Sequence, residues 1–261
     1  MKKLIFLLPF LIPVITSCDQ VDENDRYIKV EDVQVTRRVL LEEFTGQRCV
    51  NCPEAHAVIE KLEEQYGDDL IVVSIHAGSF GIKSPFGLMQ EEGDIYANRW
   101  GINSYPAGVV DRTGNVMTYD AWSAAIRNEA GKETDLEINL EATLSADQKN
   151  INITTDLLCS DNLSGSLQLW VVENDITALQ FDGDVTVTDY KHNNVFRACV
   201  NGEWGQEIAL TANVSQKLSN SIEVFVDPTY KIASWNTDHL YIVGFVYNDN
   251  GVVQVNRVKV E

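Results

Sequence analysis

The clearest chemical feature of the chain is a pair of cysteines three positions apart. Cys49 and Cys52 lie in the stretch GQRCVNCPEAHAVIEKL, residues 46–62, where apolar residues begin to recur at helical spacing. At a helix N-terminus, unpaired backbone amides and the positive end of the helix dipole stabilise a thiolate and lower its pKa. A second thiol three residues further on can attack the resulting mixed disulfide and release the substrate. The spacing therefore predicts thiol–disulfide exchange, with Cys49 as the nucleophile and Cys52 as the resolving thiol.

A histidine on the same predicted helix allows a second interpretation, in which the cysteines bind a metal. Cys49, Cys52 and His56 fall at positions i, i+3 and i+7, so the imidazole points to nearly the same side of the helix as Cys49. Two thiolates and an imidazole suit Cu(I), and His76 at the end of a predicted strand is a candidate further ligand. The competing interpretations are a solvent-facing His56 and a His76 that hydrogen-bonds at a strand end. We predict no cofactor and no metal, and keep the Cys49, Cys52 and His56 site as a weaker alternative.

An acidic stretch at residues 180–194 has the composition of a calcium-binding loop. Its carboxylates are Asp182, Asp184 and Asp189. They lack the ordered one-three-five spacing and the closing glutamate of an EF-hand. We therefore predict a solvated loop.

The elements that must position the cysteine pair alternate between strands and helices. A buried-strand run precedes the pair, and the helix after it carries apolar residues at helical spacing up to Tyr66 and stops at Gly67. The predicted segments are strands at 37–44 and 69–78, a helix within 79–100, a hairpin at 108–119 and a helix at 120–131. This order predicts an α/β domain over residues 36–132.

After residue 132 the helical pattern ends and short alternating strands take over. The first of them, residues 136–144, places every second residue on one apolar face. A series of such strands, separated by Asn, Asp, Gly and Ser clusters, predicts an all-β immunoglobulin-like β-sandwich over residues 133–261. Further strands are expected at 149–158, 166–173, 195–200, 206–214, 221–226, 239–247 and 252–260, with Trp170, Trp204 and Trp235 in the core.

The beginning of the chain predicts export to the cell envelope. A basic start, MKK, precedes an apolar run at residues 4–15 that is shorter than the ~20 residues of a membrane-spanning helix. This pattern is typical of a secretory signal peptide, here residues 1–17. Its end, ITSC, resembles the lipobox of bacterial lipoproteins, which implies a lipid anchor on Cys18 and attachment to a membrane. The acidic residues that follow predict a solvated tether over residues 18–35.

Two more cysteines, Cys159 and Cys199, fall in the predicted sandwich. The envelope is oxidising enough for structural disulfides, and this pair is a candidate for one. Each residue can instead be a small buried hydrophobe. The pairing stays open, because a bridge needs Cα atoms within about 7 Å of each other, and neither cysteine is assigned a catalytic role.

The net charge of −19 at pH 7 limits the choice of partners. Such an acidic surface repels phosphate backbones, so we expect no nucleic-acid binding. The expected partners are thiols or disulfides of other envelope proteins, together with the membrane that holds the lipid anchor.

The first predicted domain resembles the thioredoxin superfamily over residues 36–132. The resemblance rests on the strand that runs into the motif in LEEFTGQRCVNC, on the segment GINSYPAGVVDRTG at 101–114, and on Glu43 six residues before Cys49. The chain departs from that family at Arg48, where an aromatic residue is usual. Because the potential of a cysteine pair depends on its surroundings, the direction of electron flow stays open.

The same resemblance implies roles for three residues outside the cysteine pair. Tyr105 and Pro106 would be joined by a cis peptide bond whose backbone positions the substrate strand. Glu43 would be a buried carboxylate that relays the proton of Cys52.

The whole chain resembles a narrower group, the outer-membrane-protein-28-related lipoproteins of Bacteroides-type bacteria. The resemblance rests on the lipobox, on CVNCPEAH and SIHAG, and on a later sheet that contains HNNVFRA. It implies a thioredoxin-like domain followed by a β-sandwich, on the periplasmic or surface face of the outer membrane. We predict an envelope thiol–disulfide oxidoreductase. The alternatives are a non-catalytic binding or adhesion module that contacts glycan or protein, and a Cu(I)-handling protein.

Overall fold

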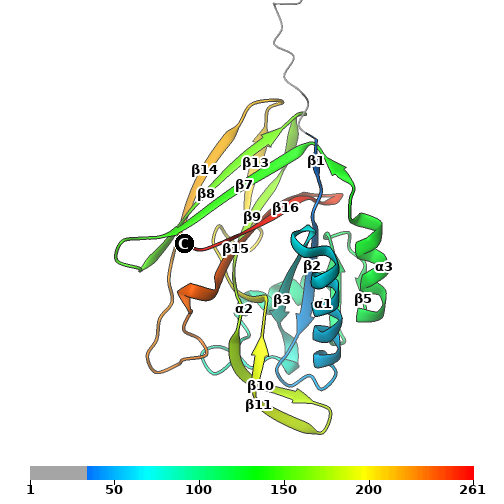
Figure 1. Ribbon diagram of the computed structural model, residues 1–261, viewed down its shortest axis with the longest axis vertical. Coiled ribbons are helices and arrows are strands. Elements are labelled where there is room, and N and C mark those ends of the chain that lie inside the picture. Colours follow the sequence, from blue (N-terminus) through cyan, green and yellow to red (C-terminus); the bar gives the residue numbers. More distant parts are fainter. Residues whose placement is uncertain (1–33) are drawn as a thin grey trace, which may run out of the picture. The chain divides into compact units, whose positions relative to one another are not determined.

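The computed structural model describes residues 34–261, and strands are its most common regular element (Figure 1). The predicted signal peptide, the lipidated Cys18 and nearly all of the acidic tether lie outside the described residues. Within residues 34–261, none of the helices is long and apolar enough to cross a membrane.

Helices and strands alternate early in the chain, and strands follow one another later. The α-helices are α1 Cys52–Tyr66, α2 Glu91–Trp100 and α3 Tyr119–Glu129, and short 3-10 helices lie at Gly67–Asp69, Gly78–Phe80 and Thr237–His239. The strands are β1 Val35–Thr36, β2 Val39–Thr45, β3 Leu70–His76, β4 Ala107–Val110, β5 Val116–Met117, β6 Glu133–Thr134, β7 Leu136–Leu144, β8 Asn150–Cys159, β9 Leu163–Glu173, β10 Ile176–Asp182, β11 Val185–His192, β12 Val195–Cys199, β13 Gln206–Leu210, β14 Gln216–Glu223, β15 Leu240–Asn248 and β16 Gly251–Lys259.

One long mixed sheet runs through most of the molecule. Its strand order is β16-β15-β9-β12-β3-β2-β4-β5, and β13 also pairs with β9. β2 and β3 are parallel, and the crossover that parallel strands need is supplied by α1, whereas β4 is antiparallel to β2. β12 joins β3 through one parallel pair, Val195 with Ser74, and lies antiparallel to β9. Strands from both halves of the chain therefore share one sheet.

This shared sheet contradicts the predicted fold class, an α/β thioredoxin-like domain followed by an all-β immunoglobulin-like β-sandwich. The protein is mostly β, with few helices and several sheets. The physical reason lies at the edge of β3, where the N–H of Ser74 donates to the carbonyl of Asn194 at 2.7 Å. Because the later half of the chain hydrogen-bonds to this edge of β3, the sheet continues past β3 and is not confined to the first half of the chain. Whether residues 36–132 and 133–261 fold independently stays a prediction.

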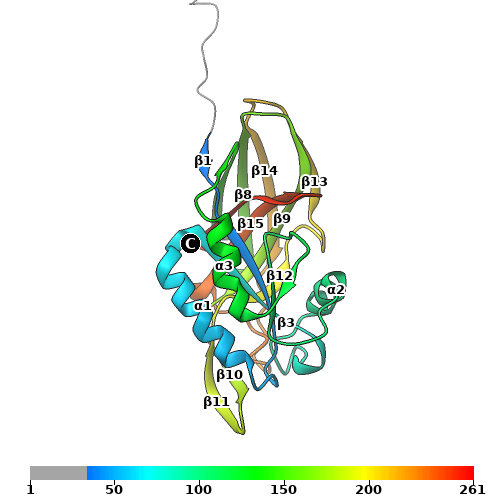
Figure 2. The same cartoon turned by 90° about the vertical axis from the view of Figure 1, so that its right-hand side faces the viewer.

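Alternate residues of β3 face different helices. Leu70 and Val72 belong to an apolar core with residues of α1 and α3, whereas Ile71, Val73 and Ile75 belong to a core with α2. Figure 2 shows α1 and α3 on one side of the sheet and α2 on the other. The core under α2 is rich in aromatic residues and extends to β9 and β15. It therefore crosses the boundary that the sequence predicted between two domains.

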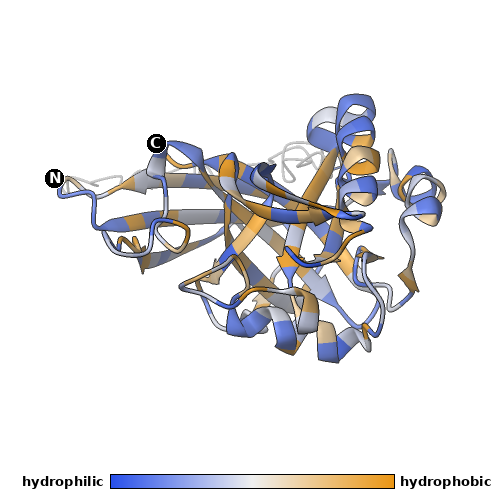
Figure 3. Cartoon of the chain, turned by 90° about the horizontal axis from the view of Figure 1, so that it is seen from below, coloured by the Kyte–Doolittle hydropathy of each residue, from blue (hydrophilic) through white to orange (hydrophobic). Residues whose placement is uncertain are grey.

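A second sheet, with the order β14-β8-β7, covers the later part of the long sheet. Buried and exposed residues alternate along β7, as predicted for residues 136–144. Figure 3 shows hydrophobic and hydrophilic residues alternating along the longer strands. The facing sides of the two sheets bury a core of aliphatic residues together with Trp235.

Helix α1 forms where the sequence predicted a helix. Ala55, Ile59 and Leu62 lie on its buried face. Pro53 occupies the first turn, where the missing N–H costs no intrahelical hydrogen bond, and Gly67 ends the helix with a φ of 55°. Pro53 and Gly67 therefore mark the two ends of the helix, which runs from Cys52 to Tyr66.

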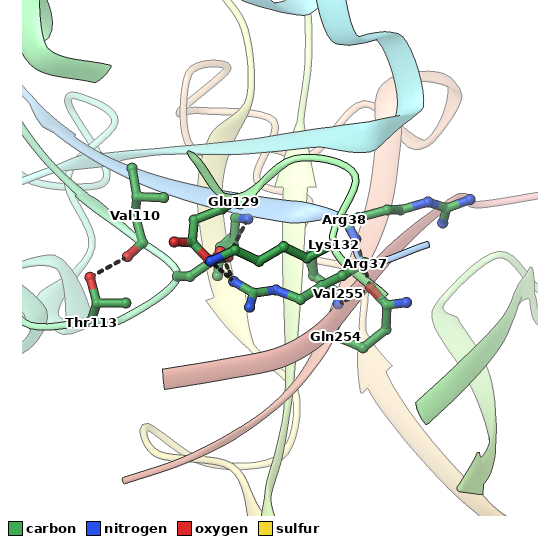
Figure 4. A network of polar contacts seen from close by, with 10 residues as sticks. Arg37, Arg38, Val110, Thr113, Glu129, Lys132, Gln254 and Val255 are labelled. Carbon is green, nitrogen blue, oxygen red and sulfur yellow. Dashed lines mark hydrogen bonds and ion pairs between the residues drawn. The ribbon is translucent and has the colours of Figure 1, made fainter. Parts of the chain in front are cut away.

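Polar contacts tie Arg37 and Arg38, just before β2, to the end of α3 and to β16 (Figure 4). The Arg37 guanidinium lies 3.0 Å from the Glu129 carboxylate, which also lies 2.8 Å from the Lys132 ammonium group. The backbone N–H of Arg38 donates to the side-chain oxygen of Gln254, 2.9 Å away. These contacts hold the last strand of the chain against its first part.

The strands β10 and β11 form a separate hairpin, which the sequence analysis did not predict. Their antiparallel pairing runs from Ile176 opposite His192 to Asp182 opposite Val185. The expectation of a solvated loop over residues 180–194 was therefore wrong. Figure 1 shows the hairpin at the same end of the molecule as the loop between β2 and α1.

Candidate disulfide site

Cys49 and Cys52 form a disulfide at the start of α1, with 5.4 Å between their Cα atoms. Cys49 lies in the turn after β2, where its N–H donates to the carbonyl of Gly46 at 3.0 Å, and Cys52 is the first residue of α1. Both cysteines are buried, with exposed fractions of 3% for Cys49 and 0% for Cys52. The structure brings together the two residues that the sequence analysis paired, and shields them from solvent.

The hairpin β10–β11 covers the disulfide through hydrogen bonds to the turn that carries it. The N–H of Phe181 donates to the carbonyl of Gln47 at 2.8 Å. The side-chain amide of Gln180 donates to the carbonyl of Cys49 at 2.9 Å. These partners are more than 130 positions apart in the sequence. The hairpin therefore covers the disulfide through tertiary contacts, which lie outside the Cys-x-x-Cys motif itself.

A buried carboxylate, Glu43 on β2, lies beside His56 on α1. Its Oε1 is 3.1 Å from Nε2 of His56, and its Oε2 accepts a hydrogen bond from the hydroxyl of Ser74. Nδ1 of His56 lies 2.8 Å from the hydroxyl of Tyr190 on β11. The contacts form a polar chain from the sheet to the hairpin. Within residues 34–261 no hydrogen bond joins Glu43 to a cysteine, so its relay role for Cys52 stays a prediction.

Three of the four histidines meet beside this polar chain. The ring centroids of His76 and His192 are 5.4 Å apart, and those of His56 and His192 are 6.5 Å apart. All three line a cavity of about 30 Å³, which has room for one or two water molecules. Nδ1 of His76 and Nε2 of His192 are buried without a partner in the described part of the chain. A water in the cavity would satisfy such nitrogens.

Burial gives these histidines different pKa values. It lowers the pKa of His76 well below its ordinary value and the pKa of His192 to about 4, and the neighbouring imidazoles act in the same direction. Burial also lowers the pKa of His56, but the Glu43 carboxylate more than offsets this, so the pKa of His56 is raised. The site therefore favours protonation of His56 over protonation of His76 and His192.

The peptide bond between Tyr105 and Pro106 is cis, as the family resemblance implied. Pro106 directly precedes β4, and the ring of Tyr105 packs on the ring of Phe80 with 5.5 Å between centroids. The carbonyl of Phe80 accepts a hydrogen bond from the N–H of Arg48, next to the disulfide, at 2.9 Å. Tyr105, at the cis bond, therefore packs on Phe80, and the carbonyl of Phe80 holds the turn that carries the cysteines. Its role in positioning a substrate stays a prediction.

The two further cysteines within residues 34–261 are not bridged, so the candidate disulfide between them is not formed. Cys159 ends β8 and is buried in the core between the two sheets. Cys199 ends β12, and its Sγ lies 2.9 Å from the hydroxyl of Tyr96. Burial raises the pKa of both thiols, to about 11 for Cys199. Thiols of this kind are poor nucleophiles at neutral pH.

No group of three or more His, Cys, Asp or Glu side chains within residues 34–261 is arranged to hold a metal ion. The alternative site at Cys49, Cys52 and His56 does not form in this state. The two sulfurs are bonded to each other. Both ring nitrogens of His56 are occupied, Nε2 by the Thr45 hydroxyl and the Glu43 carboxylate and Nδ1 by Tyr190.

The sequence analysis missed the hairpin residues Gln180, Tyr190 and His192. Two signals for a hairpin are present: the β-branched run VTVT at residues 185–188 and the Asp-Gly pair just before it. The acidic composition of the segment favoured a loop instead. Its contact with residues 46–50 has no counterpart in the side-chain pattern, because backbone carbonyls make it.

Comparison with known proteins gives one matching family and many similar solved structures. The family model described as outer membrane protein Omp28 matches residues 93–261, which is more than half of the chain. HBP35 of Porphyromonas gingivalis is similar with a TM-score of 0.66 at 16% identity, over 86% of this chain and 76% of that one. A protein of Agrobacterium tumefaciens is similar with a TM-score of 0.51 at 15% identity, over 87% of this chain and 96% of that one. At these identities the likeness shows the fold alone. No curated protein matches the sequence.

Proposed function

Given that this chain belongs to the Omp28 family of outer membrane proteins and is a protein of the cell envelope, we propose that Cys49 and Cys52 exchange disulfides with the thiols of other envelope proteins. The observation that carries the proposal is the disulfide at the start of α1. The envelope is a compartment in which such a pair can be oxidised.

The start of α1 favours a thiolate once the pair is reduced. The N–H groups of a first helical turn have no intrahelical acceptor, and the N-cap residue Asn51 makes no side-chain hydrogen bond to them. The positive end of the helix dipole acts in the same direction. A sulfur of Cys49 or Cys52 can therefore carry negative charge there at a lowered pKa.

The exchange begins from the observed disulfide. A substrate thiolate attacks the sulfur of Cys49, a substrate–Cys49 disulfide forms, and Cys52 leaves as a thiolate that takes up a proton. A second substrate thiolate then displaces Cys49. The substrate gains a disulfide and the protein pair becomes a dithiol. The same steps in reverse reduce a substrate disulfide, and the two reduction potentials set the direction.

Exchange requires the hairpin β10–β11 to move, because the side chains of both cysteines are buried. Near its tip the hairpin is held by the N–H of Gly183, which donates to the carbonyl of Val50 at 3.1 Å. Most of β11 is exposed, so little apolar surface holds it. With a net contribution of about 1 kcal/mol for each hydrogen bond, local opening is far cheaper than global unfolding.

Exposed apolar residues around the disulfide support a polypeptide substrate. Val50 is 41% exposed and Phe80 is 38% exposed, although both adjoin the turn that carries Cys49. Val185, at the tip of the hairpin, is 62% exposed. Large apolar side chains gathered at one site are typical of an interaction surface.

A trapping experiment tests the proposal on the full chain, with a model peptide that contains one disulfide as the probe. We expect reduced Cys52→Ser protein to form a stable mixed disulfide with the peptide through Cys49, because no second thiol is there to resolve it. Cys49→Ser protein should exchange no disulfide. Cys199→Ser, which removes a thiol outside the site, should behave as the wild type. Mass spectrometry of digests locates the adduct. An adduct on Cys52 in the wild type, or exchange that survives in Cys49→Ser, would overturn the proposal.

A further inference from the structure

A cavity of about 900 Å³ lies apart from the disulfide and shares no lining residue with the histidine cavity. Its walls come from the ends of β9, β13 and β15, from the last turn of α2, and from the loop between β4 and β5. The volume falls within the range of pockets that hold small organic ligands, about 300–1,000 Å³. All of its lining residues fall within residues 93–261, the part that the family model matches, whereas Cys49 and Cys52 do not.

Small side chains form the floor of this cavity. Ser166 on β9 lies opposite both Glu207 on β13 and Tyr247 on β15, and Ser164 lies opposite Ala209. Residues opposite one another, and residues two apart on one strand, project from the same face of a sheet. That face is the one away from the aliphatic core of the two sheets, since the core takes the intervening residues. Three of these five positions carry a serine or an alanine, and their small side chains leave the space that forms the cavity.

Aromatic rings form part of the wall. Trp204, Tyr247 and Trp100 all line the cavity, and each is only partly buried. The hydroxyl of Tyr247 donates to the backbone carbonyl of Trp204 at 2.6 Å, which fixes the two residues relative to each other. Rigid aromatic faces of this kind bind the C–H faces of ligands at a low cost in conformational entropy.

A buried guanidinium lines the same cavity. The side chain of Arg112 is only 3% exposed, and its Nη2 lies 3.2 Å from the Glu42 carboxylate. Its Nη1 has no hydrogen-bond partner in the described part of the chain. A buried donor left unpaired costs about 1–3 kcal/mol. Nη1 itself is closed off from the cavity, so Arg112 contributes positive charge to the wall and no free donor to a ligand.

The backbone holds Arg112 in place at some cost. Asp111 and Arg112 have φ values of 49° and 53°, in the left-handed region that favours glycine. Consecutive non-glycine residues in this conformation persist where surrounding contacts over-determine them, often at ligand sites. The rings of Tyr247 and Phe245, with centroids 4.4 Å and 4.6 Å from the guanidinium carbon, provide such contacts.

The charges of the lining select the class of ligand. Arg99 and Arg112 are balanced by Glu207 and Asp249, so the lining has no net charge. An anion would face two carboxylates and the field of a chain of net charge −19, and a cation would face two arginines. A neutral ligand with hydroxyl groups and a C–H face meets neither penalty.

From this balance, the aromatic wall and the small polar side chains of the floor, we propose that the cavity binds a neutral sugar. The rings of Trp100 and Trp204 cover its C–H face. Ser166 and Glu207 bind its hydroxyl groups. This site works independently of the cysteine pair, so the two proposals stand or fall separately.

The test uses the full chain and a glycan array that carries neutral and acidic oligosaccharides, followed by calorimetric titration of the oligosaccharides that bind. Ala209→Trp fills the floor of the cavity from an exposed position on β13. Its matched control is Ser219→Trp, at an exposed position on β14 that does not line the cavity. Circular dichroism melting confirms that each variant folds. Ser164→Trp, also in the floor, replaces Ala209→Trp if that variant does not fold.

We expect a neutral oligosaccharide to bind the wild type and Ser219→Trp equally. The floor variant should bind it at least about tenfold more weakly, a difference of about 1.4 kcal/mol. A variant with both Cys49 and Cys52 replaced by serine should bind the oligosaccharide as tightly as the wild type. Binding to acidic glycans alone, no binding to any neutral glycan at millimolar concentration, or equal binding by the floor variant and its control would each overturn the proposal.

Discussion

The side-chain amide of Gln180 donates a hydrogen bond to the backbone carbonyl of Cys49, with 2.9 Å between nitrogen and oxygen. The same amide reaches the carbonyl of Gly46 at 3.3 Å. One buried side chain of the hairpin therefore holds both ends of the turn that carries the first cysteine. The relationship makes Gln180 the residue through which access to the disulfide can be altered without changing either thiol.

The first prediction concerns the rate at which dithiothreitol reduces the disulfide. Gln180→Ala removes the bonds to the cysteine turn, and each net hydrogen bond is worth about 0.5–1.5 kcal/mol. We expect reduction to become about two- to tenfold faster, because the open state of the hairpin becomes more populated. Quenched alkylation followed by mass spectrometry measures the rate. Thr188→Ala, at an exposed position on β11, should leave the rate unchanged. Equal rates in both variants would show that the hairpin does not control access.

A second prediction concerns the ion pair between Glu43 and His56. Burial lowers the pKa of His56 and the Glu43 carboxylate raises it, with the net result above the ordinary value of 6.5. Glu43→Gln removes the carboxylate and keeps the burial, so the pKa of His56 should fall below 6.5. An NMR titration of the imidazole C–H signals measures it. The Glu60 carboxylate raises the pKa of His56 less than Glu43 does, so Glu60→Gln should lower that pKa by a smaller amount. A pKa that does not change in Glu43→Gln would mean that the pair does not persist in solution.

A third prediction follows from the low pKa of His192. Burial lowers this pKa to about 4 in the folded protein, whereas the ordinary value of 6.5 applies to the unfolded chain. Between these values the unfolded state binds more protons than the folded state. The contribution of His192 to the free energy of unfolding is therefore fully present above pH 6.5 and is lost as the pH falls towards 4. The loss amounts to about 2 kcal/mol of unfolding free energy between pH 7 and pH 5.

Urea unfolding at pH 7 and pH 5 isolates this contribution. Other buried groups titrate in the same range, so the informative quantity is the difference between wild type and His192→Gln at each pH. The variant should lose about 2 kcal/mol less than the wild type on acidification. His239→Gln, at a half-buried position outside the histidine cavity, is the control and should follow the wild type. An identical pH dependence in His192→Gln and wild type would contradict the prediction.

The cysteine site could be predicted from the sequence because its parts are local. The helix start, the pair of thiols and the stop at Gly67 all lie within one short stretch, and side-chain periodicity is enough to identify them. The partners of that stretch are not local. Gln180, Tyr190 and His192 reach it from a hairpin whose contacts are made largely by backbone carbonyls, and these leave no pattern in the sequence.

The fold class was wrong for a related reason. Alternation along β7 is a property of side chains and was predicted correctly, but the pairing of β12 with the edge of β3 is a property of the backbone. Trp170 illustrates the consequence. It was expected in a sandwich core, yet its ring packs against Tyr96 of α2 and Phe245 of β15, in the core that spans both halves of the chain.

The last prediction tests that shared core through the ion pair of Glu42 and Arg112. Glu42 on β2 is fully buried, and burial raises its pKa while the Arg112 guanidinium opposes the rise. The guanidinium in turn packs on rings of β15. Arg112→Met leaves the carboxylate buried without its partner, which should lower the free energy of unfolding by about 3–5 kcal/mol. Because a carboxyl with a raised folded pKa loses stability as the pH rises, the loss should be larger at pH 8 than at pH 5.

A double-mutant cycle separates the pair from its surroundings. Glu42→Gln combined with Arg112→Met removes both charges from the core, so the double variant should recover most of the stability lost by Arg112→Met alone. Urea unfolding of the four proteins gives the coupling energy. The transition should also stay a single step in every variant, since β2, the loop after β4 and β15 meet at this pair. Strictly additive losses would show that the two charges do not interact, and a split transition would show that the two halves of the chain unfold separately.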